Sequence, residues 1–363
     1  MTEHLDFSLA LHRTAAAPPS RSFCWSPYSV ASALGLAAAA TGGQTRGELL
    51  AALRAEDPPR ALLSGAAELD GSGAAEPPVL AVANTLWAHE QLQVRASFRT
   101  ELAEWPGGAV RTAPFRTDPE GVRQRINADV AETTRDLIPE LLDPGAVDPD
   151  TVAALVNALY LKVSWREAFD PQATAQQPFR TPSGEREVPT MTATRRMGHA
   201  AAEGWQAVSL PAAGGVEAVV LLPDGDLEQA EPALDAAALE RLLDGMQQQR
   251  VELHLPRFEA TGEAELTGPL GALGVRSVFT GGADFSPLAA EPLEISTIVH
   301  QAVLRVDESG LEGAAATAAM MRLTAILQEP EPIVVRVDRP FLFLVRHRAT
   351  GALYFLARVV DPA

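Results

Sequence analysis

The chain lacks the residue patterns on which most enzyme sites depend. Cys24 is the only cysteine among 363 residues, so no internal disulfide can form. The motifs H-E-x-x-H, C-x-x-C, G-x-S-x-G and G-x-x-x-x-G-K-S/T, which mark metal, redox, hydrolase and phosphate sites, do not occur in the sequence. The seven histidines are scattered along it. We therefore expect a protein that is not an enzyme and that has no catalytic residue, metal site or cofactor.

Basic residues are also scarce. The chain has 29 Lys and Arg against 47 Asp and Glu, a formal net charge of −18, and Lys162 is its only lysine. Nucleic-acid binding needs clustered basic side chains, and an anionic membrane surface would repel this charge. The longest apolar run, 30–40, is much shorter than the ~20 residues that a membrane-spanning helix needs. We expect neither nucleic acid nor a membrane as a partner.

Source and compartment are inferred from composition. A lysine-poor chain with much Ala and Pro is typical of the coding bias of a GC-rich bacterium. The first residues, MTEHLDFSLALHRT, carry acids where a signal peptide carries positive charge. These features favour a cytoplasmic bacterial protein, and an extracellular location stays open.

Helical patterns dominate the first half of the chain and strand patterns the last third, which predicts an α+β fold. Ser26, followed by a proline, is a suitable N-cap for a buried helix over 28–40. The apolar run 152–163 predicts a central strand buried on both faces, in which the amide of Asn157 needs a partner. No linker divides the chain. Further helices are expected over 5–14, 45–53, 126–134 and 266–273, and further strands over 79–87, 216–222, 251–255, 295–306, 333–337, 341–346 and 352–359.

The stretch from Glu308 to about Ala325 consists mainly of small residues and has no apolar helical stripe. Ala favours helices, so a surface helix is the first interpretation. With the two-residue period of a strand, both charges between Leu311 and Leu323 fall on one face. The hydroxyl of Thr317 is the only polar group on the other face. Such a segment can enter a closely packed place at low cost in side-chain entropy.

His300 lies within a strand-like apolar run. Taken alone, a buried, hydrogen-bonded histidine is favoured over a catalytic base, because spacing assigns no Ser or Cys as its nucleophile. The glycine-rich segment 268–274 does not match G-x-G-x-x-G and favours a helix turn.

Several segments, in the correct order, resemble the signature segments of the serpin family. They are NALYLK with the following Trp165 and Phe169 (157–169), the strand and hinge before the reactive loop (295–310), the closing signature that begins RPFLF (339–359), ADFS (283–286) and SPYS (26–29). The resemblance runs from about Phe7 to Pro362.

The resemblance implies an α+β serpin fold of three β-sheets and about nine helices. It implies a single domain over 1–363 with an exposed reactive-centre loop at about 308–332. It also implies a monomeric suicide-substrate inhibitor, whose partner is a serine protease held as a covalent acyl complex. The protease cleaves the loop and is acylated, and the loop then inserts into the central sheet as a new strand and carries the protease along.

Residue roles follow from the same resemblance. The implied shutter, where the central strands part, consists of Ser26, Ser29, Asn157 and His300. The implied breach, where insertion begins, contains Trp165. The implied hinge consists of Glu308, Gly310, Leu311, Gly313, Ala314, Ala315 and Ala316. Arginine at position 315, on the charge-free face, is expected to turn the inhibitor into a substrate, and arginine at position 316 to be milder.

Two features depart from the family pattern. Inhibitory members usually have Thr or Ser where Leu311 stands, and the loop is longer than usual on its far side. The alternative is therefore a non-inhibitory serpin, a chaperone or carrier whose loop is cleaved without trapping.

The family's usual spacing, counted forward from Glu308, predicts Thr324–Ala325 as the reactive bond, flanked by Arg322 and Leu323. Counting back from the closing signature moves the bond toward Glu329. The forward count is preferred because the inserted length must match the sheet. An apolar or small residue at this bond suits chymotrypsin-, elastase- or subtilisin-like proteases.

Overall fold

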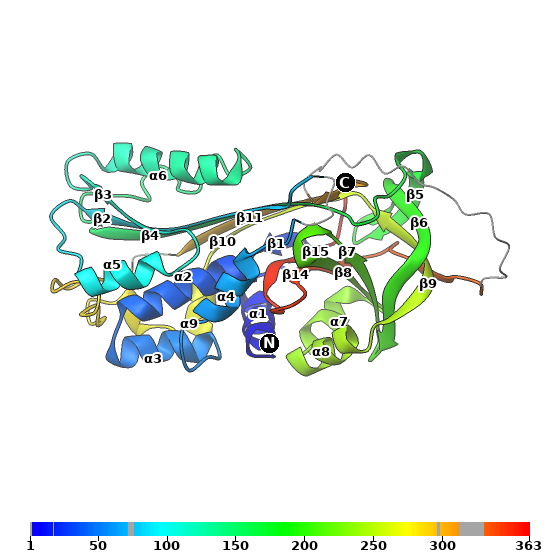
Figure 1. Ribbon diagram of the computed structural model, residues 1–363, viewed down its shortest axis with the longest axis horizontal. Helices are drawn as coiled ribbons and strands as arrows, with labels where there is room; N and C mark the ends of the chain where they lie inside the picture. Colours follow the sequence, from blue (N-terminus) through cyan, green and yellow to red (C-terminus); the bar gives the residue numbers. More distant parts are fainter. Residues whose placement is uncertain (1, 17, 72–75, 296–297, 312–329) are drawn as a thin grey trace.

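The computed structural model describes residues 2–363 except 17, 72–75, 296–297 and 312–329. Figure 1 shows an elongated molecule in which a long sheet occupies one end and a strongly curved sheet the other. The helix α6 lies on one face of the long sheet, and a group of helices that includes α2, α3 and α9 lies on the opposite face. No helix in the described part of the chain is both long and apolar enough to cross a membrane.

The long sheet has six strands, and its order mixes distant parts of the chain. From edge to edge it consists of β10 (Phe258–Glu265), β11 (Val299–Val306), β12 (Gly310–Leu311), β4 (Ala153–Ser164), β2 (Val79–His89) and β3 (Gly108–Ala113). All pairs are antiparallel except β2 with β3, which is parallel.

The curved sheet has nine strands. They are β1 (Phe23–Trp25), β15 (Leu353–Val359), β14 (Phe341–His347), β8 (Val216–Pro223), β7 (Trp205–Pro211), β6 (Gly184–Ala202), β9 (Gln247–Pro256) and β13 (Ile333–Arg336), with β5 (Ala175–Thr181) beside β6. The 19 residues of β6 pair first with β5, then with β9 and finally with β7. Through β6 all nine strands belong to one sheet, so the described strands form two hydrogen-bonded sheets where the resemblance implies three.

The described residues form nine α-helices. They are α1 (Thr2–Ala15), α2 (Pro27–Ala40), α3 (Gly43–Ala52), α4 (Arg60–Ala67), α5 (Ala96–Ala103), α6 (Pro119–Thr134), α7 (Leu227–Ala233), α8 (Ala236–Asp244) and α9 (Thr267–Ala272). The start of α2 is as predicted, because the Ser26 side chain accepts a hydrogen bond of 3.0 Å from the backbone N–H of Ser29. Nearly all of α2 is buried, and it packs against both β4 and β15.

Some sequence expectations need correction. The strand β4 is not buried throughout, because residues 153–155, Asn157 and Lys162 are partly exposed. The expected strand 295–306 begins at Val299, with 296–297 outside the described residues. The strands β5, β6, β7, β3 and β10 were not predicted. β6 gave no strand pattern because it has few apolar residues among many polar ones. β10 gave none because it contains small residues such as Gly262. Glycine is needed there, since a Cβ at position 262 would lie 1.9 Å from the Cys24 carbonyl oxygen.

Candidate functional site

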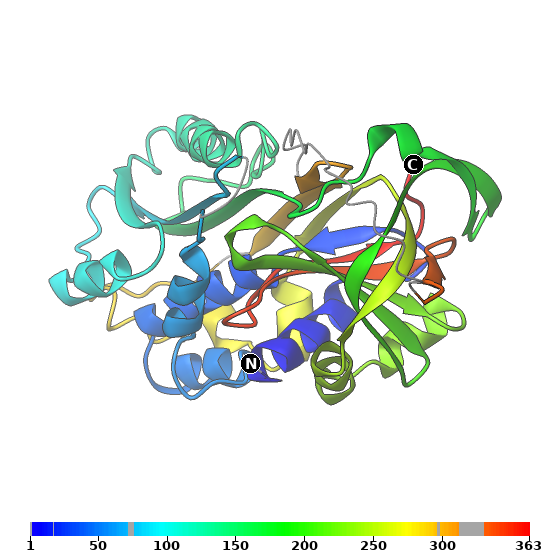
Figure 2. The same cartoon turned by 45° about the vertical axis from the view of Figure 1, so that its right-hand side comes forward.

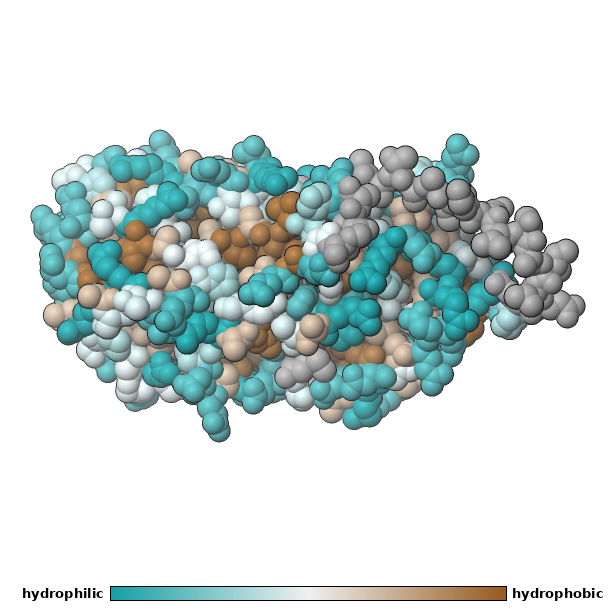
Figure 3. All heavy atoms as spheres, viewed as in Figure 1, coloured by the Kyte–Doolittle hydropathy of each residue, from teal (hydrophilic) through white to brown (hydrophobic). Residues whose placement is uncertain are grey.

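In the described part of the six-stranded sheet, β11 and β4 are connected only through the short strand β12. β11 pairs with β10 along its full length, and β4 pairs with β2 over residues 153–162. On their facing edges, the described backbone is paired only through β12, where Leu311 lies opposite Val306 on one side and Val163 on the other. We call this boundary between β11 and β4 the seam (Figure 2). In the view of Figure 3, a stretch of apolar surface lies between α6 and the helices on the opposite face of the long sheet.

A tight turn at the upper end of the seam leads from β11 into β12. The Asp307 carboxylate accepts hydrogen bonds from the backbone N–H groups of Ser309 (2.7 Å) and Gly310 (3.1 Å). The N–H of Asp307 donates to the Gly310 carbonyl at 3.1 Å. A Cβ at position 310 would lie 2.2 Å from the Val163 carbonyl oxygen, so glycine is needed for β12 to approach β4.

Trp165 fixes this turn against the end of β4. Its indole N–H donates to the Asp307 carbonyl at 2.8 Å, and its backbone N–H donates to the Ser309 carbonyl at 2.9 Å. The backbone N–H of Phe169 donates to the carbonyl of Glu308 at 2.9 Å. The chain just beyond β4 therefore holds all three residues of the turn by their backbone.

The side chain of Glu308 anchors the same turn to Arg257, just before β10, and to Thr174, just before β5. It is 5% exposed and accepts hydrogen bonds from the Arg257 guanidinium, at 2.6 Å from Nε, and from the Thr174 hydroxyl. Burial raises the pKa of Glu308, but the hydrogen bonds from Arg257 and Thr174 outweigh it and lower the pKa below its ordinary value. Glu308 is therefore a carboxylate at neutral pH.

Further along β11, away from β12 and in what we call the lower seam, His300 forms a hydrogen bond with the start of α2. Its Nε2 accepts a 3.0 Å hydrogen bond from the backbone N–H of Ser26, and its ring packs edge-on against Trp25 with 6.4 Å between centroids. Burial lowers the pKa of His300 to about 4. The imidazole is thus neutral at pH 7. Because Nε2 accepts, its proton lies on Nδ1.

Asn157 lies across the seam on β4. Its side-chain amide donates to the side-chain Oδ1 of Asn84 at 2.6 Å, and the Ser32 hydroxyl donates to the same oxygen at 3.0 Å. Asn84 in turn donates to the carbonyl of Pro106 at 2.6 Å. The Oδ1 atom of Asn157 is buried and has no hydrogen-bond partner among the residues that the structure describes. A buried acceptor in this state raises the free energy of the intact form.

A cavity of about 120 Å³ occupies the lower seam. Ser29, Asn157 and His300 line it together with apolar residues of α2, β4 and β11. The segment between α6 and β4 (135–152), which we call the covering segment, closes the cavity through Leu141 and Leu142. The cavity therefore has strands on two sides, a helix on the third and a covering segment on the fourth.

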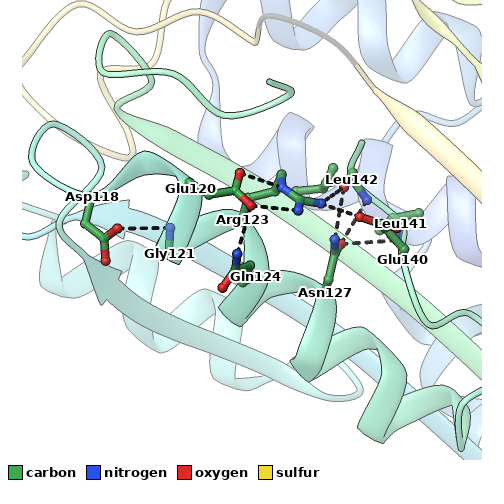
Figure 4. A network of polar contacts seen from close by, with 9 residues as sticks. All are labelled: Asp118, Glu120, Gly121, Arg123, Gln124, Asn127, Glu140, Leu141 and Leu142. Atoms are coloured by element: carbon green, nitrogen blue, oxygen red, sulfur yellow. Dashed lines mark hydrogen bonds and ion pairs between the residues drawn. The ribbon is translucent and has the colours of Figure 1, made fainter. Parts of the chain in front are cut away.

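Hydrogen bonds to α6 hold the covering segment in place (Figure 4). Arg123 donates to the Glu140 carboxylate and to the Leu142 carbonyl, each at 2.6 Å. The Asn127 amide accepts from the N–H groups of Leu141 and Leu142 and donates to the Leu142 carbonyl, at 2.9 to 3.1 Å. We call these contacts the α6 clamp.

The structure brings the four expected shutter residues together around one cavity or its immediate border, and it brings Trp165 against Asp307 and Ser309. Asn157 and His300 line the cavity from opposite strands. The remaining hinge and reactive-bond residues lie outside the described residues. They are Gly313, Ala314, Ala315, Ala316, Arg322, Leu323, Thr324 and Ala325.

Sequence reasoning missed several partners of these residues. Asn84 carried a usable signal, since it is a second asparagine within an apolar strand and lies directly opposite Asn157 in the register. Arg257 and Thr174 gave no signal in the sequence, because they lie 51 and 134 positions from Glu308 in the chain.

Comparison with known proteins bears on the whole chain. Residues 2–362 match the family model described as serpin (serine protease inhibitor). A leukocyte elastase inhibitor from Bos taurus is 32% identical over 360 residues, covering 95% of this chain and 94% of the relative. Iripin-2 from Ixodes ricinus is 30% identical, with 97% and 91% covered. An uncharacterised serpin-like protein from Thermococcus kodakarensis is 29% identical, with 98% and 84% covered. None of these organisms is a bacterium, so the bacterial source stays a prediction.

Solved structures agree with the predicted fold. Human thyroxine-binding globulin superposes with a TM-score of 0.86 at 24% identity, covering 100% of this chain and 98% of the other. Uncleaved ovalbumin superposes with a TM-score of 0.85 at 25% identity and 99% coverage of both chains. These likenesses confirm the α+β fold with its helices and sheets.

Proposed function

The chain belongs to the serpin family, and on that premise we propose that it is a suicide-substrate inhibitor of serine proteases. It acts as a monomer of one domain and traps one protease as an acyl complex. The protease serine attacks the carbonyl carbon of Thr324, an ester forms, and the new amino group of Ala325 leaves with the C-terminal peptide. Insertion of the upstream loop then moves the ester before water can hydrolyse it. The protein inhibits and does not catalyse.

The observation that carries this proposal is the seam, which β12 fills only at its upper end. Leu311 pairs with Val163 of β4 and Val306 of β11, and both pairings are antiparallel. Position 317 is six residues after Leu311, and Asn157 and His300 are six residues before these two valines. If the register of β12 continues, Thr317 therefore lies between them on the inward face. Its hydroxyl can donate to the unpartnered Oδ1 of Asn157 and accept from Nδ1 of His300.

The energetics favour insertion once the loop is cut. Each added residue can form ladder hydrogen bonds with β11 or β4, worth about 0.5–1.5 kcal/mol net apiece. The charge-free face also removes apolar surface from water. Insertion would further satisfy the Asn157 acceptor, which is unpaired among the described residues.

The alternative is a non-inhibitory carrier or chaperone, and it rests on the size of Leu311. Leu311 is 1% exposed and sits between Val163 and Val306 without displacing the strand pairs on either side. A leucine at this position is therefore compatible with insertion, which supports the inhibitory function over the alternative.

One gel tests the proposal. The protein is incubated with chymotrypsin, elastase and subtilisin in turn, and the products are separated in SDS. We expect a stable band with the mass of both proteins less the C-terminal peptide. The same protease with its catalytic serine already blocked should give no such band. Clean cleavage with every protease and no complex would support the carrier or chaperone instead.

A further inference from the structure

A row of alternating charges crosses the outer face of the six-stranded sheet just below β12. Arg305 lies directly opposite Glu259 in the register of β11 and β10, with Nε at 2.7 Å from the carboxylate. On the other side of the seam, Nζ of Lys162 lies 3.2 Å from the carboxylate of Glu76. From the β10 side to the β2 side, the row therefore runs Glu259, Arg305, the seam, Lys162 and Glu76.

Both bases point to the outer face of the seam. Lys162 directly precedes Val163 and Arg305 directly precedes Val306, and these two valines face the interior at 1% and 2% exposure. Because side chains alternate along a strand, Lys162 and Arg305 face outward. Their side chains are 27% and 48% exposed, so both are accessible to a further charge.

The first residue after β12 is an acid. Leu311 pairs with Val163 and Val306, so one more residue in the same register lies opposite both Lys162 and Arg305. That residue is Glu312. Strands flanking an inserted strand are about 10 Å apart, and directly opposite side chains have Cβ atoms about 5 Å apart. One carboxylate between the two strands can therefore reach both bases.

We propose that Lys162 and Arg305 form the docking site for the Glu312 carboxylate during loop insertion, and that this contact sets the register of the incoming strand. Glu312 completes an alternating row across five segments of chain, and a slip by one residue would turn its charge toward the interior. The chain has a single lysine, and it stands at this position. This inference rests on the proposed inhibitory function. It adds three positioning residues to that function.

The test measures how many inhibitor molecules are consumed for each chymotrypsin molecule trapped. We expect Glu312→Gln to raise this number about two- to fivefold, the range expected for partly exposed ion pairs. Glu312→Lys should raise it further, because three positive charges would then meet. The matched control is Glu331→Gln, an exposed glutamate on the far side of the predicted cleavage site, and it should leave the number unchanged.

Two further measurements separate pairing from a general structural effect. In a variant with both Lys162→Gln and Arg305→Gln, a further Glu312→Gln should no longer raise the number, because the two bases that it pairs with are already gone. The difference between wild type and Glu312→Gln should shrink in 1 M NaCl, because salt screens exposed charges. An effect of Glu312→Gln that is undiminished in this double variant, and that salt does not change, would overturn the pairing.

The outcomes also separate this inference from the function on which it rests. If wild type traps chymotrypsin and all Glu312 variants trap it equally well, the docking site is wrong and the inhibitory function stands. If wild type forms no complex and its Tm does not rise when the loop is cut, both are wrong.

Discussion

At the scale of single residues, His300 is the side chain whose chemistry is best defined by its surroundings. It accepts a hydrogen bond from Ser26, contacts the edge of Trp25 and lines the seam cavity. The same burial that makes it neutral makes its protonation costly. His4, which accepts a 3.1 Å hydrogen bond from the N–H of Leu353, has the same property, with a pKa lowered to about 4.

We predict that acid weakens the intact form between pH 6.5 and 4. The pKa of His300 falls from its ordinary 6.5 in the unfolded chain to about 4 in the folded one, so the unfolded state binds more protons in this window. The contribution of the neutral His300 to the free energy of unfolding is fully present above pH 6.5. It is lost as the pH falls from 6.5 to 4, and the loss is about 3 kcal/mol for this one group. Urea unfolding at pH 7.5, 5.5 and 4.5 measures the loss.

The control is His300→Gln, which cannot titrate. At pH 7.5 this variant should be less stable than wild type, because the Ser26 N–H loses or weakens its acceptor, at a cost of about 1–3 kcal/mol. Its remaining pH dependence should be smaller than that of wild type. An equal slope in both proteins would show that His300 does not titrate in this window.

The reactive bond is also a residue-scale prediction. Cleavage by chymotrypsin within the trapped complex should release a C-terminal peptide that begins at Ala325. Mass spectrometry of that peptide measures the position directly. A peptide that begins at Pro330 would instead favour the backward count. Trypsin should cut after Arg322 and mostly escape, because the inserted strand would then be shorter by two residues.

At the scale of elements, the α6 clamp connects the covering segment over the lower seam to α6. Leu141 and Val147 of this segment share an apolar cluster with Val156 and Ala158 of β4, and Val299 of β11 packs against the same cluster. The segment therefore contacts both sides of the seam. An incoming strand must pass beneath it.

We predict that Glu140→Ala speeds insertion, because it removes the carboxylate that Arg123 holds at 2.6 Å and leaves the rest of α6 intact. Fewer inhibitor molecules should then be consumed per protease, and the intact form should convert more readily on mild heating. The control is Arg125→Ala on the same helix, whose guanidinium contacts Asp118 at 3.3 Å and not the covering segment. Identical behaviour of the two variants would exclude the clamp as a brake.

The elements differ in how far their sequences predicted them. The helix α2 and the strand β4 were predictable, because a capping serine and a long apolar run are local signals. β6 was not, because its partners β5, β9 and β7 supply its stability and its own alternation is weak. The grouping of Ser26, Ser29, Asn157 and His300 was expected by resemblance only, and their shutter role stays a prediction. The partners of Glu308 were not predictable, because contacts between distant positions leave no local pattern.

At the scale of the whole molecule, the seam predicts that the intact fold is not the most stable one available to this chain. We expect the loop-cleaved protein to have a much higher Tm than the intact protein, since a full strand would add ladder hydrogen bonds and burial. Calorimetry before and after cleavage measures the difference. An unchanged Tm would contradict insertion.

The register refines the expectation for arginine substitutions in the loop. Position 315 would lie opposite Leu159 and Ala302 on the inward face, so Ala315→Arg should block the gain in Tm and the trapping of protease. Alternation alone predicts a milder effect at position 316. However, that position would lie opposite Ala158, which is 3% exposed and belongs to the cluster beneath α6. We therefore expect Ala316→Arg to block insertion as well, and normal trapping by this variant would place α6 further from the inserted strand.

One described strand, β12, lies between β11 and β4, and under the proposed mechanism this limits how many proteases one molecule can trap. A reversible inhibitor is reused after each dissociation, so its potency is set by affinity. Under the proposed mechanism, a molecule whose own loop has filled the seam has trapped one protease and cannot act again. The number of proteases inhibited would then be at most the number of inhibitor molecules, so the supply of this protein would have to match the protease molecule for molecule.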